Sequence, residues 1–260
     1  SAYGGGMCNY NESMPTIVNC IFTGNASTYW DGGGMYNYQS SPTLINCTFR
    51  KNSAGSYGGG MSNNESSPNV TNCIFWDNDA VIDGNEIYNH DTVPNVSYCD
   101  IEGDLNGSGC GGDDSNDIGG NIDEDPLFYD PNDPNDYHLG PNSPCIDAGT
   151  NTPIGGLPTT DIDGEPRVID GNGDGNSIVD MGADEYDYRD ADFDNDGIVN
   201  FIDYAMFANF WQTESPDFSL DEDEDNDVDM NDLALFVKDW LWQAGWTKTF
   251  AAGCGQSMGR

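Results

Sequence analysis

Two acidic runs near the C-terminal end of the chain place oxygen ligands at the spacing of calcium-binding loops. The first run offers Asp192, Asp194, Asp196, the backbone carbonyl of Ile198, Asn200 and Asp203. The second run begins 29 residues later and offers Asp221, Asp223, Asp225, Asp227, Asp229 and Asp232. Calcium takes six to eight hard oxygen ligands, and ligands at loop positions 1, 3, 5, 7, 9 and 12 wrap around one ion. We therefore predict two Ca²⁺ sites.

Each run leads into a segment whose apolar residues have helical spacing. The first segment has Phe201, Ala205, Phe207 and Trp211, and the second has Leu233, Phe236, Val237 and Trp240. Two calcium loops, each followed by one helix, are similar to a type I dockerin over residues 188–243. That resemblance implies a cohesin-like protein as a partner. Loop positions 10 and 11 hold Phe201-Ile202 and Met230-Asn231, where cohesin-binding dockerins often have a Ser-Thr pair.

A third acidic stretch begins in the same way at Asp170-Gly171-Asn172-Gly173-Asp174-Gly175. It has no carboxylate at position 12 of the loop. The stretch therefore predicts either a third calcium site or a turn built from Gly and Asn.

The composition of the chain restricts its partners. Its 260 residues include 46 Asp and Glu but only 7 Lys and Arg, which gives a net charge of −39. Nucleic acid is excluded as a partner because binding it requires basic residues that neutralise phosphates. No apolar run of about 18 residues is present, so we expect no membrane span. The excess of negative charge favours divalent cations as partners.

The first hundred residues repeat one pattern every 26 to 28 residues. A Gly-rich element starts at Gly4, Gly32, Gly58 and Gly84, and a β-prone element follows from Pro15, Pro42, Pro68 and Pro94. Within the second element, the apolar columns are Ile17, Leu44, Val70 and Val96; Cys20, Cys47, Cys73 and Cys99; and Phe22, Phe49, Phe75 and Ile101. A period of this length predicts a solenoid of stacked β-coils.

The cysteine and asparagine columns have specific expected roles. Stacked coils place equivalent side chains about 4.8 Å apart. We expect the four column cysteines to form a buried ladder of thiols, with bridges between coils as the alternative. Better disulfide candidates lie outside the column, namely Cys8, Cys110, Cys145 and Cys254. Asparagine tolerates αL geometry, so we place αL bends at Asn19, Asn46 and Asn72. Stacked Asn side chains that bond to the next coil are expected at Asn25, Asn52 and Asn78, and at Asn9, Asn37, Asn63 and Asn89.

The paired Gly-Gly-x-hydrophobic and Phe-x-x-Asn elements of residues 1–101 resemble the polymorphic outer membrane protein repeat, a family that implies a right-handed parallel β-helix. Residues 125–186 resemble the closing segment of secreted β-helix proteins of the choice-of-anchor type, through Tyr137-His138-Leu139, Asp161-Ile162-Asp163-Gly164 and Met181-Gly182-Ala183-Asp184-Glu185. The expected organisation is a mainly β chain with four parts. These are parallel β-helix repeats at 1–124, an irregular cap over the C-terminal end of the β-helix at 125–187, a dockerin-like α-helical domain at 188–243, and a tail at 244–260.

Residues suited to catalysis are scarce. His90 and His138 are the only histidines, and neither lies in a nucleophile motif. β-Helix polysaccharide lyases commonly need a basic residue, and Arg50 and Lys51 are the only ones in the repeats. For Arg167 we expect pairing with nearby acids. We therefore expect no enzyme activity.

Three functions remain open. The first is a non-catalytic extracellular structural protein that associates head-to-tail with copies of itself, as an oligomer or filament. The second is a carbohydrate-active module held by a cohesin, and the third is a glycan-binding adhesin using Tyr29, Trp30, Tyr36, Tyr38, Tyr57 and Trp76. The chain begins inside a repeat, so we expect a processed chain, secreted or at the cell surface. Possible glycosylation sites are Asn11, Asn64 and Asn106.

Overall fold

The computed structural model describes residues 3–130, 133, 136–187, 191, 193, 199–209, 211, 230–237 and 240. The chain forms two compact units, Ser1–Tyr186 and Asp187–Arg260, which are taken separately below. None of the described helices is both long enough and apolar enough to cross a membrane.

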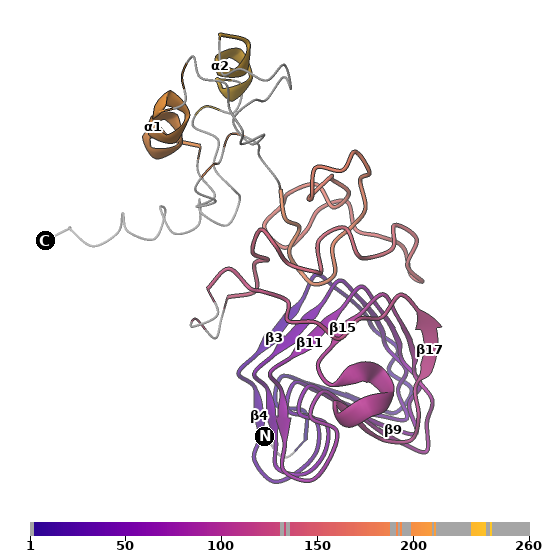
Figure 1. The fold of residues 1–260 in the computed structure, drawn as a ribbon. Coiled ribbons are helices and arrows are strands. Elements are labelled where there is room, and N and C mark those ends of the chain that lie inside the picture. Colours follow the sequence, from indigo (N-terminus) through magenta and orange to yellow (C-terminus); the bar gives the residue numbers. More distant parts are fainter. Residues whose placement is uncertain are drawn as a thin grey trace, which may run out of the picture. The chain divides into compact units, whose positions relative to one another are not determined.

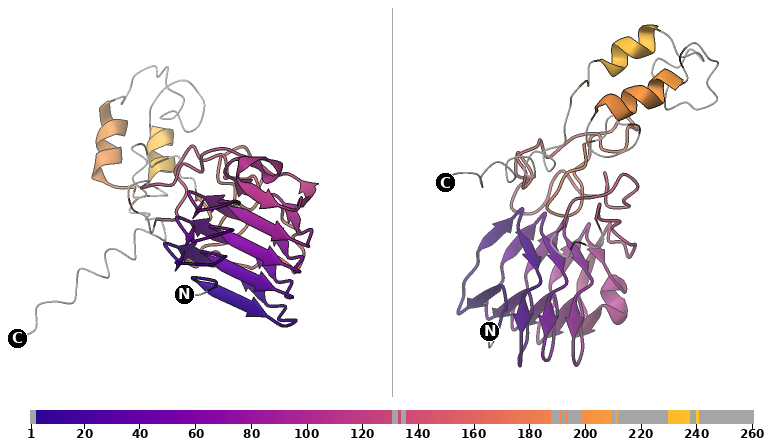
Figure 2. Two further views of the ribbon diagram at one scale, coloured as in Figure 1. Left: turned by 90° about the horizontal axis from the view of Figure 1, so that it is seen from below. Right: turned by 90° about the vertical axis from the view of Figure 1, so that its left-hand side faces the viewer.

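The first unit begins as a parallel β-solenoid of about four coils, which confirms the predicted mainly β solenoid (Figures 1 and 2). One sheet stacks β1 (Met7–Tyr10), β5 (Met35–Tyr38), β9 (Met61–Asn64), β13 (Ile87–His90) and β16 (Cys110–Gly112). A second stacks β2 (Thr16–Val18), β6 (Thr43–Ile45), β10 (Asn69–Thr71), β14 (Asn95–Ser97) and β17 (Asn116–Gly119). A third stacks β3 (Ile21–Thr23), β7 (Thr48–Arg50), β11 (Ile74–Trp76) and β15 (Asp100–Ile101), and a fourth stacks β4 (Ala26–Ser27), β8 (Ser53–Ala54) and β12 (Asp79–Ala80).

The sheets pair equivalent repeat positions, so the apolar columns become files that line the core. Leu44 pairs with Ile17 and Val70, and Phe49 pairs with Phe22 and Phe75. The three phenyl rings are stacked, with centroids 4.4 and 4.6 Å apart. A further file of Met35, Met61 and Ile87 closes the core from the first sheet.

The cysteine column forms the expected ladder of thiols. Cys47, Cys73 and Cys99 are fully buried, and the backbone N–H of Cys47 and of Cys73 each points at the sulfur one coil on, at 3.4 Å. All seven cysteines of the described residues are free thiols, so the disulfides expected at Cys8, Cys110 and Cys145 do not form. Cys8 is exposed on the first coil, whereas Cys145 lies in another core, so their positions preclude a bridge. Cys254 lies outside the described residues.

The predicted bends occur at the expected asparagines. Asn19, Asn46 and Asn72 have φ of 49°, 50° and 54°, and Tyr98 takes this place in the fourth coil with φ of 51°. The bend lets the aliphatic residue and the cysteine three positions later face the same core. A glycine is required at Gly32, where φ is 70° and a Cβ would lie 2.4 Å from the carbonyl oxygen of Met35.

Two ladders of asparagine side chains run through the solenoid. In the first, each Nδ2 donates to the Oδ1 one coil on, from Asn9 through Asn37 and Asn63 to Asn89, at 2.8, 2.8 and 3.0 Å. In the second, Asn25 donates to Asn52 and Asn52 to Asn78, at 3.0 and 2.8 Å. We expected these amides to stack at corners, but Asn37 and Asn63 lie inside strands and point into the core.

Both ladders end on acceptors near the C-terminal end of the solenoid. Asn89 donates to the hydroxyl of Ser115, and Asn78 donates to the carboxylate of Glu86. The same end is covered by a short π-helical turn, η1 (Asp104–Ser108), which inserts Leu105 into the core and lies across the solenoid in Figure 1.

Residues 125–186, the lateral segment, lie along the side of the solenoid rather than over its C-terminal end as expected (Figure 1). Their backbone bonds to corner asparagines of three coils, Asn19, Asn46 and Asn72. A second core of Ile74, Phe128, Leu139, Cys145 and Met181 forms between the wall and this segment. The expectation was wrong because η1 already covers the C-terminal end of the solenoid. The apolar side chain of Ile74, by contrast, points outward from the wall and is buried only by the lateral segment.

In the second unit, a helix follows each acidic run: α1 (Phe201–Asn209) and α2 (Met230–Phe236). Phe207 and Phe236 are buried with ring centroids 5.5 Å apart, so the two helices share a small core. Phe201 and Val237, which the spacing also placed on the apolar face, are 73% and 56% exposed.

Replacing Asn63 by Leu is expected to destabilise the first unit by about 2–5 kcal/mol. The change leaves the buried amide of Asn37 without an acceptor and the carbonyl of Asn89 without a donor, and each such group costs about 1–3 kcal/mol. The neighbouring Asn64→Leu is the matched control, because Asn64 is next in β9 and faces outward. Urea unfolding measures both variants; equal midpoints would show that the ladder contributes nothing.

Candidate functional site

The αL corners of the solenoid hold the lateral segment. Nδ2 of Asn19 donates to the carbonyl of Thr160 at 2.6 Å, and Nδ2 of Asn46 donates to the carbonyl of Asp180 at 2.9 Å. Asn72 both donates to and accepts from the backbone of Thr150, at 3.0 and 2.9 Å. The αL backbone points each of these side chains outward, so three coils present one type of group to the segment.

Arg50 serves this docking and is not available to a substrate. Its Nη1 donates to the carbonyls of Asp133 and Asp136 at 3.0 and 2.6 Å, and its guanidinium lies 4.4 Å from the centre of the Phe128 ring. The side chain is only 3% exposed. Lys51, the other basic residue of the repeats, lies 3.9 Å from Asp77.

Arg167 is fully buried and pairs with an acid, as expected. Its Nη1 lies 3.4 Å from Oε2 of Glu185 and donates to the carbonyl of Ala183 at 3.2 Å. Glu185 lies beside Asp180, whose carboxylate accepts the N–H groups of Asp147 and Tyr186, each at 2.7 Å. Burial raises the pKa of Glu185 above its usual range, and the Asp180 charge adds to this. The lateral segment therefore buries carboxylates in excess of its cations.

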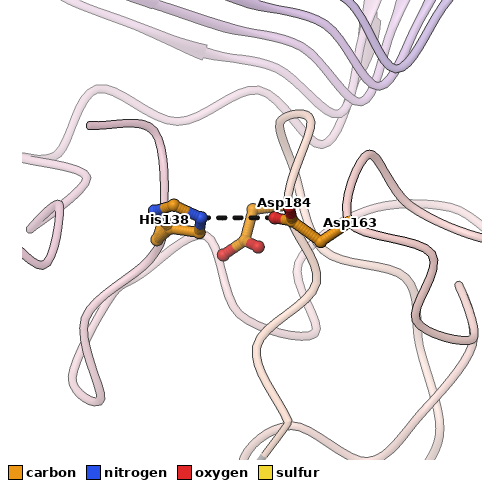
Figure 3. Close-up of side chains that lie close together, drawn as sticks. All are labelled: His138, Asp163 and Asp184. Atoms are coloured by element: carbon orange, nitrogen blue, oxygen red, sulfur yellow. Dashed lines mark hydrogen bonds and ion pairs between the residues drawn. The ribbon is translucent and has the colours of Figure 1, made fainter. Parts of the chain in front are cut away.

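His138 lies in the most highly charged cluster of the segment. Its Nδ1 is 2.7 Å from Oδ1 of Asp136, and its Nε2 is 3.2 Å from Oδ2 of Asp163 (Figure 3). Burial lowers the pKa of His138, but the hydrogen bonds that its ring donates to the carboxylates of Asp136 and Asp163 outweigh burial and raise the pKa to about 10. The imidazole is therefore a cation held between two acids.

Asp184 completes the cluster. Its carboxylate lies beside His138 and Asp163 in Figure 3, and one ligand atom from each of the three residues fits within 4.8 Å of the others. Oδ2 of Asp184 accepts the N–H of Leu139 at 2.9 Å, whereas Oδ1 is buried and has no hydrogen-bond partner among the described residues. Burial raises the pKa of Asp184 to about 7. His138, Asp163 and Asp184 belong to three separate motifs of the sequence, and the spacing of these motifs does not predict that the three side chains lie together.

Of the predicted calcium ligands, Asn200 and Asp203 lie within the described part of the chain. The Asn200 side chain accepts the N–H of Ile202, and the Asp203 carboxylate accepts the N–H of Asn200, both at 2.8 Å. This reciprocal pair caps the start of α1. It places the side-chain oxygens of Asn200 and Asp203, at positions 9 and 12 of the predicted loop, at the start of α1. For Asp232, the structure describes the position in α2 but not the side chain. The other predicted ligands, Asp192, Asp194, Asp196, Ile198, Asp221, Asp223, Asp225, Asp227 and Asp229, lie outside the described residues.

The third acidic stretch contains a turn that its own Asp side chains stabilise. The two oxygens of Asp170 accept the N–H groups of Asp174 and Gly175, at 3.1 and 2.8 Å. Oδ1 of Asp174 accepts the N–H of Asn176 at 2.8 Å. Because these oxygens bond to their own backbone, the stretch is an Asx-type turn in the structure.

The three possible glycosylation sites differ in their surroundings. Asn11 is exposed in a bend, and Asn64 is half-buried at the end of β9. Asn106 lies within η1. Asn11 is therefore more exposed than Asn64.

A buried acid also joins the solenoid to the lateral segment. Oδ2 of Asp100 accepts the thiol hydrogen of Cys145 at 3.2 Å, and Oδ1 accepts the N–H of Glu124 at 3.2 Å. Asp100 has no exposed surface, and burial raises its pKa to about 7. Its ionisation in the folded chain is therefore unfavourable.

Replacing Asp100 by Asn should stabilise the protein at pH 8 but not at pH 4. An unfolded Asp titrates near pH 4, so between about pH 4 and 7 only the folded state keeps this proton, and stability falls by up to about 1.4 kcal/mol per pH unit. The asparagine variant lacks this loss. Melting temperatures between pH 4 and 8 measure the difference, with the exposed Asp114→Asn as the control for net charge. A gap between Asp100→Asn and the parent that does not change with pH would contradict the assignment.

Comparison with known proteins does not assign this site. No protein-family model matches the chain, and searches of curated proteins and of solved structures found no match either. The function is therefore argued from the residues and their geometry alone.

Proposed function

We propose that this chain is a non-catalytic extracellular structural protein that associates with other copies of itself through the edge of its first coil. The observation that carries this proposal is that all four sheets end there. Strands β1, β2, β3 and β4 each pair with the second coil on one side, and no described strand pairs with their other side. Unpaired strand edges are templates for pairing with another chain.

The bonding pattern shows which groups this edge offers. The N–H of Thr43 donates to Pro15, and the N–H of Asn19 donates to Ile45. In a parallel ladder, alternate residues bond to the same neighbour, so the N–H of Thr16 points away from the second coil. Thr16 is exposed, which leaves room for an added strand.

The apolar files also continue to this edge. Met7 and Cys20 are only partly buried, whereas their equivalents one coil on, Met35 and Cys47, are fully buried. A strand or coil placed on the edge would bury this remaining apolar surface. Burial of apolar area and new ladder bonds would act together.

The strand donor that we propose is the tail of a neighbouring copy. Residues 246–252 include the strand-favouring residues Trp246, Thr247, Thr249 and Phe250, and they lie outside the described residues. An edge on one copy and a strand donor on the next make a heterologous contact, which generates open filaments unless the rotation closes a ring. This pairing mode is β-strand addition.

We also propose that the second unit binds two Ca²⁺ ions as a dockerin-like module. The reciprocal cap between Asn200 and Asp203 supports this proposal. When bound, the ions neutralise carboxylates that otherwise repel one another. A cohesin-like protein remains a proposed partner, on the resemblance alone.

Glycan binding is the second candidate function, and two exposed aromatic residues favour it. Tyr29 is 76% and Trp30 50% exposed at a corner of the solenoid, and Trp30 stacks on Tyr3 with centroids 5.4 Å apart. Of the other aromatic residues considered, Tyr36 is buried and Trp76 packs against the second core. A lyase-like activity is disfavoured because the guanidinium of Arg50 already donates to the carbonyls of Asp133 and Asp136.

Edge pairing predicts that Thr16→Pro weakens self-association by about tenfold or more. Proline removes the outward N–H of Thr16 without breaking a bond to the second coil, and a lost bond together with its unpaired acceptor costs about 1–3 kcal/mol. Thr16→Val keeps the N–H and is the matched control, while deletion of residues 246–260 tests the donor. Sedimentation velocity in calcium measures association. A truncated chain that still forms polymers of normal length would contradict the role of the tail.

Removing calcium is expected to melt the second unit and leave the first unit folded. The loop carboxylates repel without the ion, whereas the solenoid is held by its apolar files and ladders. Circular dichroism at 222 nm with and without a chelator follows α1 and α2. Asp192→Ala should weaken calcium binding, and Asp170→Ala, in the Asx-type turn, should not. An unchanged spectrum after chelation would reject the two calcium loops.

A further inference from the structure

The cluster around His138 has a feature that neither docking nor self-association requires. Three ligand atoms, from His138, Asp163 and Asp184, converge from three separate stretches of the lateral segment (Figure 3). We propose that these three residues form a binding site for a divalent transition-metal ion, Zn²⁺ being the ion that best fits, in addition to the proposed calcium loops.

The separation of the ligand atoms suits a tetrahedral ion. Zn²⁺ binds imidazole nitrogen and carboxylate oxygen at about 2.0–2.2 Å, which places neighbouring tetrahedral ligands about 3.3 Å apart. Nε2 of His138 and Oδ2 of Asp163 are already 3.2 Å apart. A metal ion fits between them once it replaces the shared proton, and metal binding to histidine releases protons in this way.

The buried oxygen of Asp184 independently points to a missing cation. Asp184 is 2% exposed, and its Oδ1 has no hydrogen-bond partner among the described residues. A buried carboxylate oxygen without a partner is costly, and such an atom calls for an ion or a water. The N–H of Leu139 binds the other oxygen at 2.9 Å and so fixes the carboxylate as a third ligand.

Asp136 does not face the proposed ion but holds the ring of His138 in place. Its Oδ1 accepts from Nδ1 of His138 at 2.7 Å, which leaves Nε2 as the nitrogen that faces Asp163 and Asp184. A carboxylate bound to the distal nitrogen of a histidine is a regular feature of metal sites, because it fixes the tautomer and the ring orientation.

The ligand types select the class of metal. Calcium prefers oxygen ligands alone, whereas imidazole suits zinc and its neighbours. The side chains of His138 and Asp163 are 10% and 12% exposed, so the site is nearly closed to solvent. A bound ion would tie the stretches at 138, 163 and 184 together.

Zinc titration of the calcium-saturated full chain tests the proposal, because excess calcium occupies the two loops. The parent is expected to bind one Zn²⁺, and His138→Gln should lose at least about 100-fold in affinity. Asp136→Asn, which leaves the three ligands in place, should lose about 10–100-fold. His90→Gln is the matched control, since it removes the only other histidine of the chain. A parent that binds no zinc, or a loss that His90→Gln shares, would overturn the site.

Cobalt substitution keeps the test decisive if His138→Gln fails to fold. Co²⁺ in the parent should show the visible absorption of a four-coordinate site without a thiolate charge-transfer band, because the ligands are nitrogen and oxygen. A thiolate band would assign the metal to cysteines and reject the proposal. Asp163→Asn is the second ligand variant, and near-ultraviolet circular dichroism checks that its lateral segment is folded. An intact variant that binds cobalt as the parent does would also reject the proposal.

Discussion

In-register stacking is the constraint on which the rest of this structure depends. Every coil places each side chain directly against its equivalent in the next coil, as Leu44 lies against Ile17 and Val70. Apolar residues then form continuous files, but a polar residue that enters the core must find its partner in the same file. Asparagine satisfies this condition because its amide carries both a donor and an acceptor. The ladder from Asn9 to Asn89 can therefore run through the core at little cost in free energy, provided that it ends on an acceptor such as the hydroxyl of Ser115.

The same repetition creates the outer docking surface. An αL residue in every coil turns the chain and points its side chain outward, so Asn19, Asn46 and Asn72 form a row of amides along one corner. The lateral segment has little regular structure of its own, and its backbone groups bond to this row. Irregular chain can be held firmly here because the scaffold is periodic and the bonding groups recur at every coil.

The sequence could predict what is periodic and could not predict what is brought together by tertiary contacts. The 26-residue repeat yields the parallel solenoid, the thiol ladder and the αL bends, since each follows from residue type and spacing. The side-on position of the lateral segment depends on outward faces such as Ile74, and no spacing marks them. The cluster of His138, Asp163 and Asp184 was hidden for the same reason, because three non-repeating stretches supply it. The predicted calcium ligands are the converse case, since their spacing is local and needs no tertiary contact to be recognised.

Basic side chains are scarce in this chain, and most of those described are buried. Arg50, Lys51 and Arg167 are the only Lys or Arg among the described residues. Arg50 is buried against the lateral segment, and Arg167 is buried within it. His138 is held between two acids in the same segment. These few cations do not match the buried carboxylates around them, as the unpartnered oxygens of Asp184 and Glu185 show. Either additional basic side chains or bound metal ions would neutralise this excess of buried carboxylates. With the proposed ions bound, the stability of this chain, whose net charge is −39, would depend on the concentration of those ions.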